Sequence, residues 1–169
     1  MAAVVEIDEI NGAGLVLHHG ILNINFGSVD AFELDPVANK LALDSNSYVK
    51  WVQLHVSSMG DSSAVQNLRI SSETARPAGS VLVFNGHVTQ AIYDATKKTA
   101  AAQPGTGIAD TPHHVPTVAP ATSNIGFAGQ LGGSLVAPGS SDFALIQVRL
   151  TTVTESADPV LNFEFDETA

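Results

Sequence analysis

The 169-residue chain has no cysteine, so neither a disulfide framework nor a thiolate metal site can form. Basic residues are also scarce: seven Lys and Arg stand against 17 Asp and Glu, and the formal net charge is −10. Proteins that bind nucleic acid displace counterions with a stripe of basic side chains, and the seven here are scattered. The sequence therefore predicts no nucleic-acid partner, and an anionic membrane surface is disfavoured for the same reason.

Long apolar runs are absent too, and none approaches the length of a transmembrane helix. The first ten residues, MAAVVEIDEI, carry acids where a secretory signal peptide needs basic residues. We therefore expect synthesis in a cytoplasm without a cleavable signal, and no membrane association. Charged residues form only 14% of the chain, which predicts a polar, uncharged surface that tolerates being covered by partners. The length predicts a single domain over residues 1–169.

Helical periodicity is nearly absent, and several windows instead alternate apolar and polar residues, as half-buried β-strands do. One example is VKWVQLHV. Val52, Leu54 and Val56 point to one face of this predicted strand. Trp51, Gln53 and His55 point to the other. Turn signals rich in Gly, Pro and Asn separate the windows. This pattern predicts an all-β fold, a jelly-roll-like β-sandwich. The predicted strands lie near residues 21–26, 49–57, 64–71, 79–85, 143–153 and 160–166.

Residues 97–124, KKTAAAQPGTGIADTPHHVPTVAPATSN, interrupt the strand pattern and hold four of the eight prolines. Structureless connections of this length are uncommon in compact domains unless they are functional or disordered, and a disordered one is normally richer in charge. We predict a long Pro/Ala/Thr-rich arm, stiffened toward polyproline geometry, that becomes ordered only on a neighbouring protein surface. Its candidate interface residues are Pro104, Ile108, Pro112, His113, His114, Val115, Pro116 and Val118.

No motif predicts a catalytic, cofactor or metal site. Adjacent histidines occur at 18–19 and 113–114, but neighbouring residues of a strand face opposite sides of a sheet, and the chain has no His-x-His. Histidines at a surface or interface are the favoured interpretation. Glycine clusters at 105–107 and 126–133 lack the Lys-Ser/Thr of a phosphate-binding loop. Turns, or close backbone packing between subunits, explain them better.

Carboxylates are plentiful, but nothing in the sequence distinguishes a catalytic pair among them, and no Gly-x-Ser-x-Gly elbow is present. We therefore expect a protein that is not an enzyme and needs no cofactor. Trp51, the only tryptophan, lies on the polar face of its predicted strand. Three roles are open to it: a sugar-stacking platform, an anchor at a protein interface, or burial within the chain.

Short segments of the chain resemble virion structural proteins of tailed bacteriophages. The segment SSDFALIQV at 140–148 resembles their Ser-Asp-aromatic-hydrophobic-Gln strand near the C-terminus. The ending FEFDET at 163–168 is similar to their aromatic-x-aromatic-Asp-Glu tail. WVQL at 51–54, followed by QNLR at 66–69, resembles their central strand pair. Residues 1–48 have no part in this resemblance.

The resemblance implies a capsid decoration, or cement, protein with a β-sandwich or jelly-roll fold. Such a protein binds the outside of the head as a homo-oligomer, usually a trimer, and braces the major capsid protein against internal DNA pressure. Related architectures occur in tail tubes, baseplates and fibres, so a structural role in the tail or baseplate stays open. A carbohydrate-binding β-sandwich that recognises the host through Trp51 is the alternative from a different class.

Overall fold

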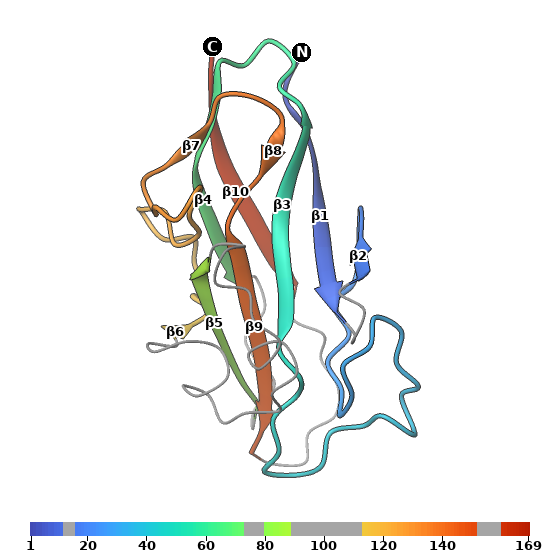
Figure 1. Ribbon diagram of the computed structural model, residues 1–169. Coiled ribbons are helices and arrows are strands. Elements are labelled where there is room, and N and C mark those ends of the chain that lie inside the picture. The colour runs from blue at the N-terminus through green and yellow to red at the C-terminus, as the bar shows by residue number, and fades with distance from the viewer. Residues whose placement is uncertain (12–15, 73–79, 89–112, 152–159) are drawn as a thin grey trace.

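The computed structural model describes residues 1–11, 16–72, 80–88, 113–151 and 160–169, which contain ten β-strands and no helix (Figure 1). This confirms the predicted all-β class. No helix long and apolar enough to cross a membrane occurs in these ranges. The strands are β1 (Val4–Asn11), β2 (Val16–His18), β3 (Lys50–Ser58), β4 (Ala64–Ser72), β5 (Ser80–Val88), β6 (His113–His114), β7 (Ser134–Leu135), β8 (Gly139–Ser140), β9 (Phe143–Leu150) and β10 (Leu161–Thr168).

The strands form two antiparallel sheets. The larger sheet has the order β2-β1-β3-β9-β5-β6, and β8 pairs with β3 beyond the point where β9 leaves it. The smaller sheet has the order β10-β4-β7. In Figure 1, β4 and β10 lie behind β3 and β9. The two sheets therefore present one face to each other.

The main hydrophobic cluster lies between the facing sides of the two sheets. Alternate residues of β3 point into it, as their period-two pattern predicts, and Val52, Leu54 and Val56 are fully buried. Burying one such side chain contributes about 1.5–3 kcal/mol, so the cluster is the main source of stability. The other buried members are Val65, Leu68, Ile70, Val115, Ile125, Phe127, Ala144 and Ile146.

A second, smaller cluster covers the opposite face of β3. Its buried members are Ile10, Val49, Trp51, Phe143 and Leu145. The indole of Trp51 meets the ring of Phe143 edge to face, with the ring centroids 5.5 Å apart. The larger sheet is therefore packed on both faces at this point, although the sequence indicated a polar face here.

Five of the six predicted strands are confirmed over the described residues, with small shifts at their ends, and the prediction at 21–26 is wrong. Residues 79, 152 and 153 of the predicted strands lie outside the described residues. Between residues 19 and 49 the chain forms no strand. Ile21 N donates one hydrogen bond to Ile7 O (2.8 Å), and the chain forms no ladder with β1 beyond that bond. The side chain of Leu22 is 94% exposed as a result. β1 itself was not predicted.

Residues 20–49, called the 20–49 segment below, are fixed by hydrogen bonds rather than by a sheet. Asp35 Oδ1 accepts from the backbone N–H groups of Val37 and Ala38, at 2.8 and 2.9 Å, and closes a local turn. These two hydrogen bonds, Ala38 first, lower the pKa of the Asp35 carboxyl. Near the end of the segment, Ser47 N donates to Val148 O (2.8 Å) of β9. The segment is therefore anchored next to β9 before it enters β3.

The predicted arm at 97–124 lies partly outside the described residues, as do Pro104, Ile108 and Pro112. Its described end packs against its own chain. Val115 is buried in the main cluster, and Pro116 O accepts a hydrogen bond from Ser72 N at 2.8 Å. The expectation that Val115 becomes ordered only on another subunit is therefore wrong, because β3, β4 and β9 already supply its apolar neighbours.

The remaining interface candidates of the arm occupy different positions. The backbones of His113 and His114 form β6 and pair with β5. Pro116 is half-buried, whereas the side chain of Val118 is exposed. Of the described candidates, Val118 is thus the one whose apolar side chain is left on the surface.

Candidate functional site

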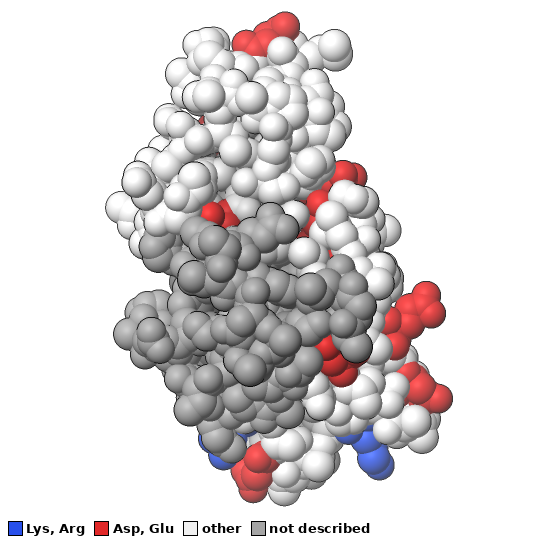
Figure 2. Space-filling model, viewed as in Figure 1, with Lys and Arg blue, Asp and Glu red and all other residues white. Residues whose placement is uncertain are grey.

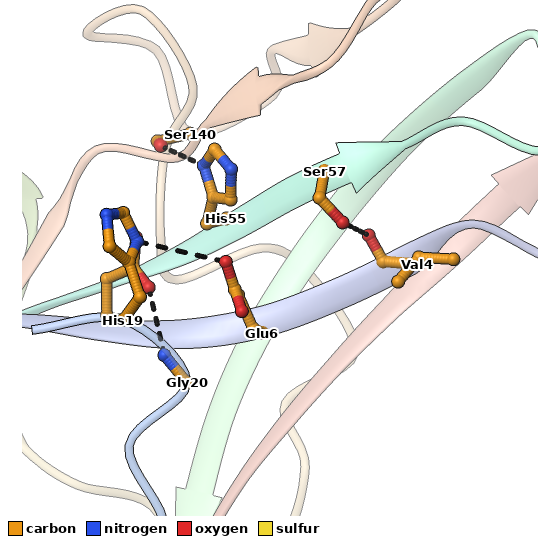
Figure 3. A network of polar contacts seen from close by, with 8 residues as sticks. Val4, Glu6, His19, Gly20, His55, Ser57 and Ser140 are labelled. Atoms are coloured by element: carbon orange, nitrogen blue, oxygen red, sulfur yellow. Dashed lines mark hydrogen bonds and ion pairs between the residues drawn. The ribbon is translucent and has the colours of Figure 1, made fainter.

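Three ionisable side chains meet on the face of β1 that is turned away from the main cluster: Glu6, Asp8 and His19. Figure 3 shows Glu6 and His19 directed toward each other. Residues i and i+2 of a strand share a face, which places Glu6 and Asp8 side by side. The hairpin of β1 and β2 returns the chain so that His18 is opposite Glu9, and the next residue, His19, reaches Asp8. The cluster thus follows directly from strand geometry.

The three side chains converge on a small volume. His19 Nδ1 lies 3.0 Å from Asp8 Oδ2 and 3.8 Å from Glu6 Oε1. One potential ligand atom from each residue lies within 4.8 Å of the other two. The carboxylate of Asp8 is fully buried, while His19 and Glu6 are partly exposed. The cluster is therefore reached from solvent on the side of His19 and Glu6.

A glycine follows His19 and completes the cluster. Gly20 N donates to Asp8 Oδ1 (3.3 Å), so the buried carboxylate is held by backbone on one oxygen and by His19 on the other. The φ of Gly20 is +62°, a conformation that costs glycine little and other residues more. This turn directs the chain from β2 into the 20–49 segment.

His55 of β3 adds a second imidazole beside the cluster. It is the cross-strand partner of Glu6, and its ring centroid lies 5.9 Å from that of His19. His55 Nδ1 lies 3.0 Å from Ser140 Oγ. The hydroxyl of Ser140 and the carboxylate of Asp8 thus contact different imidazoles, whereas a Ser-His-Asp relay needs one imidazole between them. The donor set instead suits a divalent cation.

The sequence contains a signal for this cluster other than the His-x-His spacing. The i, i+2 spacing that brings two ligands to one face is present as Glu6-x-Asp8. The adjacent histidines do diverge, as expected for neighbours on a strand. His19 joins the carboxylates, whereas His18 stacks on Phe32 with ring centroids 3.9 Å apart. What the sequence did not reveal is the hairpin register that brings His19 to Asp8.

Trp51 does not offer an exposed aromatic face. Its side chain is fully buried in the second cluster, so burial within the chain is the alternative that the structure bears out. A sugar ring or a partner subunit cannot stack on an indole that has no accessible surface. The expectation of a sugar platform or interface anchor at Trp51 is therefore wrong.

A buried ion pair lies on the opposite face of β1 from the cluster. Lys50 Nζ lies 3.0 Å from Glu9 Oε1, and it also donates to Ala31 O at 2.7 Å. Both side chains are excluded from solvent. The pair joins β1 and β3 to the 20–49 segment, which makes its role structural.

The segment at 140–148 contains residues whose side chains fix the backbone of neighbouring segments. Ser141 lies where the chain passes from β8 to β9, and it exchanges hydrogen bonds with Leu54 through Leu54 N to Ser141 Oγ (3.0 Å) and Ser141 N to Leu54 O (2.9 Å). Asp142 accepts from Gly129 N, 2.9 Å from each carboxylate oxygen, and fixes the glycine-rich turn. The Ser-Asp pair therefore positions backbone.

The Asp-Glu ending is also structural. Asp166 of β10 accepts from Asn67 Nδ2 (2.8 Å) and from Arg69 (2.9 Å), and these bonds, Asn67 first, lower its pKa. Glu167 accepts from the Ser62 hydroxyl and from Ala3 N, and these bonds lower its pKa in the same order. Both carboxylates therefore link β10 to other segments of the same chain.

Comparisons with protein-family models, with curated proteins and with solved structures find no match to this chain.

Proposed function

We propose that the chain is a non-enzymatic structural protein of a tailed-bacteriophage virion, a capsid decoration protein that binds the outside of the head shell. Its partners are the major capsid protein and further copies of itself, arranged as a trimer. In this proposal the two facing sheets are a jelly-roll-like sandwich, and the Pro/Ala/Thr-rich arm adds a contact to the shell or to a neighbouring copy. If the protein is located at the tail or baseplate instead, it is a structural protein of that part of the virion and not a capsid decoration protein.

The observation that carries the proposal is the exposed apolar surface of the 20–49 segment. This segment projects beyond the edge of the larger sheet (Figure 1). Leu22 is 94% exposed and Val37 is 76% exposed. Both lie in a segment that hydrogen bonds hold against the rest of the chain. Scattered apolar residues on a surface are ordinary, but several on one projecting segment are typical of a contact with another protein. The other exposed members are Val29 and Leu43.

The low charge of the surface supports the same proposal. Figure 2 shows a face on which the described side chains are mostly uncharged, with scattered acidic groups and few basic ones. A surface of this kind lacks the basic stripe that nucleic acid requires, and it loses little hydration when a protein covers it.

The test is binding of purified chain to heads of the parent phage that were assembled without it. We expect the wild-type chain to co-sediment with heads and to raise the temperature at which they burst. Leu22→Glu combined with Val37→Glu should weaken this binding at least tenfold, because charged side chains are depleted at the centres of protein interfaces. Val136→Glu is the matched control, since Val136 is 74% exposed in a different part of the chain.

Two results would contradict the proposal. Binding to tails but not to heads would move the protein to the tail machinery. Equal binding by the double variant and by Val136→Glu would show that the 20–49 segment is not the surface that contacts the head. Circular dichroism of each variant checks that the fold is retained, and sedimentation equilibrium of the free chain measures whether it is a trimer.

A further inference from the structure

We propose that Glu6, Asp8 and His19 form a binding site for one divalent transition-metal ion, with Zn²⁺ as the best fit. The proposal is independent of the function proposed above, because it concerns the isolated chain. It rests on the position, burial and chemical type of three donors on one face of β1.

The geometry of the donors is close to that of a bound site. In tetrahedral zinc sites the ligand atoms lie about 2.0–2.2 Å from the ion, which separates them from each other by about 3.3–3.6 Å. Here His19 Nδ1 is 3.0 Å from Asp8 Oδ2 and 3.8 Å from Glu6 Oε1, and the three donor atoms lie within 4.8 Å of one another. Small side-chain movements therefore suffice to reach the distances of a metal site. Three protein ligands leave a fourth position for water.

Burial and charge indicate a cation at this point. The fully buried carboxylate of Asp8 and the partly buried one of Glu6 both approach the same nitrogen of His19. Two negative charges this close repel each other, and burying a carboxylate is costly unless a cation or hydrogen bonds compensate it. A neutral imidazole donates a single N–H and cannot serve both carboxylates at full strength. A divalent ion between the three groups compensates both charges at once.

The surrounding contacts orient the ligands. Gly20 N holds Asp8 Oδ1, which leaves Oδ2 directed at His19. Such second contacts are a regular feature of metal sites, where they fix ligand orientation. The ligand type favours zinc over calcium, because Ca²⁺ takes six to eight oxygen ligands and this cluster offers two carboxylates and an imidazole. A bound ion would tie β1 to His19, the residue that precedes the 20–49 segment.

The experiment titrates Zn²⁺ into the metal-stripped full chain by calorimetry at pH 7.5. We expect saturable binding of one ion per chain, at least tenfold tighter than Ca²⁺ under the same conditions. His19→Ala and Glu6→Gln should each weaken Zn²⁺ binding at least tenfold, whereas His18→Ala, which removes the neighbouring imidazole, should leave it unchanged. Zn²⁺ in hundredfold excess over its dissociation constant should raise the melting temperature of the wild type by about 5–10 °C.

A second measurement uses Co²⁺ as a spectroscopic probe. The wild type should give the intense visible absorption of tetrahedral Co²⁺, and His19→Ala should lose it. Glu6 and His19 are the diagnostic positions because they are partly exposed, whereas Asp8→Asn alters a buried group and can impair folding. Three results would overturn the proposal: no saturable Zn²⁺ binding, unchanged affinity in both His19→Ala and Glu6→Gln, or equal loss in His18→Ala.

Discussion

Replacement of Lys50 by methionine tests how strongly the buried ion pair supports the fold. The ammonium of Lys50 is excluded from solvent, 3.0 Å from Glu9 Oε1 and 2.7 Å from Ala31 O. Methionine preserves most of the side-chain volume but removes the charge and both contacts. The carboxylate of Glu9 then stays buried without its cation, and Ala31 O loses a donor.

The expected cost follows from that geometry. Removing one partner of a buried ion pair typically costs about 3–5 kcal/mol, because the remaining charge keeps its desolvation penalty. Domains of this kind are stable by only about 5–15 kcal/mol in total. For a chain of this length the loss corresponds to a fall in melting temperature of about 6–20 °C. The combined change Lys50→Met with Glu9→Leu should recover most of it, because no buried charge remains.

The assay is urea unfolding followed by circular dichroism, with Lys40→Met as the matched control because Lys40 is exposed. The control should unfold within about 0.5 kcal/mol of the wild type, as surface substitutions usually do. A double-mutant cycle over the two single variants and the pair isolates their interaction. If Lys50→Met unfolds at the same urea concentration as Lys40→Met, the pair contributes nothing and the reasoning fails.

Two further predictions concern the glycine-rich turn and acid stability. Gly133→Ala should destabilise the chain by about 1–3 kcal/mol, because a Cβ there would lie 2.7 Å from the backbone oxygen of Phe127. Gly132→Ala, whose Cβ would meet nothing within 4 Å, should be neutral in the same urea titration, and equal effects would refute the clash. The pKa values of Asp166 and Glu167 are lowered in the folded chain, so their contribution is present above the ordinary pKa near 4 and is lost as pH falls through the folded values. Stability measured from pH 7 to 2 should therefore fall below about pH 4, and less steeply in the Asp166→Asn, Glu167→Gln double variant.

The strands β3 and β10 were predictable because alternating apolar residues mark the side of each strand that faces the main cluster. β3 and β10 carry apolar residues at every second position, and those residues do face the main cluster. β1 was missed because acids occupy both of its faces: Glu6 and Asp8 on one, Glu9 on the other. Local pattern cannot reveal that each of those acids has a partner from elsewhere in the chain.

The false strand at 21–26 shows the opposite failure. Leu22, Ile24 and Phe26 alternate as they would in a strand, and Ile24 and Phe26 do pack against the main cluster. A strand also needs a neighbour along its length, and the pairing with β1 ends after the single bond from Ile21. Alternation thus indicated burial for two of the three residues, but it does not show whether a segment pairs with a neighbouring strand.

The candidate site depended on information that alternation does not contain. Glu6 and Asp8 could be placed together from their spacing, but the approach of His19 depends on the register of the hairpin. The burial of Trp51 depends similarly on Phe143, which is remote in sequence and meets it across the pairing of β3 with β9. In both cases the deciding contact comes from strand pairing at a distance.

The acids of β1 attach the 20–49 segment to the sheet from two sides. Asp8 and Glu9 are neighbours on a strand, so their side chains leave opposite faces. Asp8 contacts Gly20, the first residue of the segment, and His19 just before it. Glu9 binds Lys50, whose ammonium also donates to Ala31 O farther along the segment. Two separate attachments hold the segment more firmly than one, because freeing it requires both to break. The acidic residues that interrupt the apolar alternation of β1 therefore also anchor the 20–49 segment, which carries the proposed contact surface.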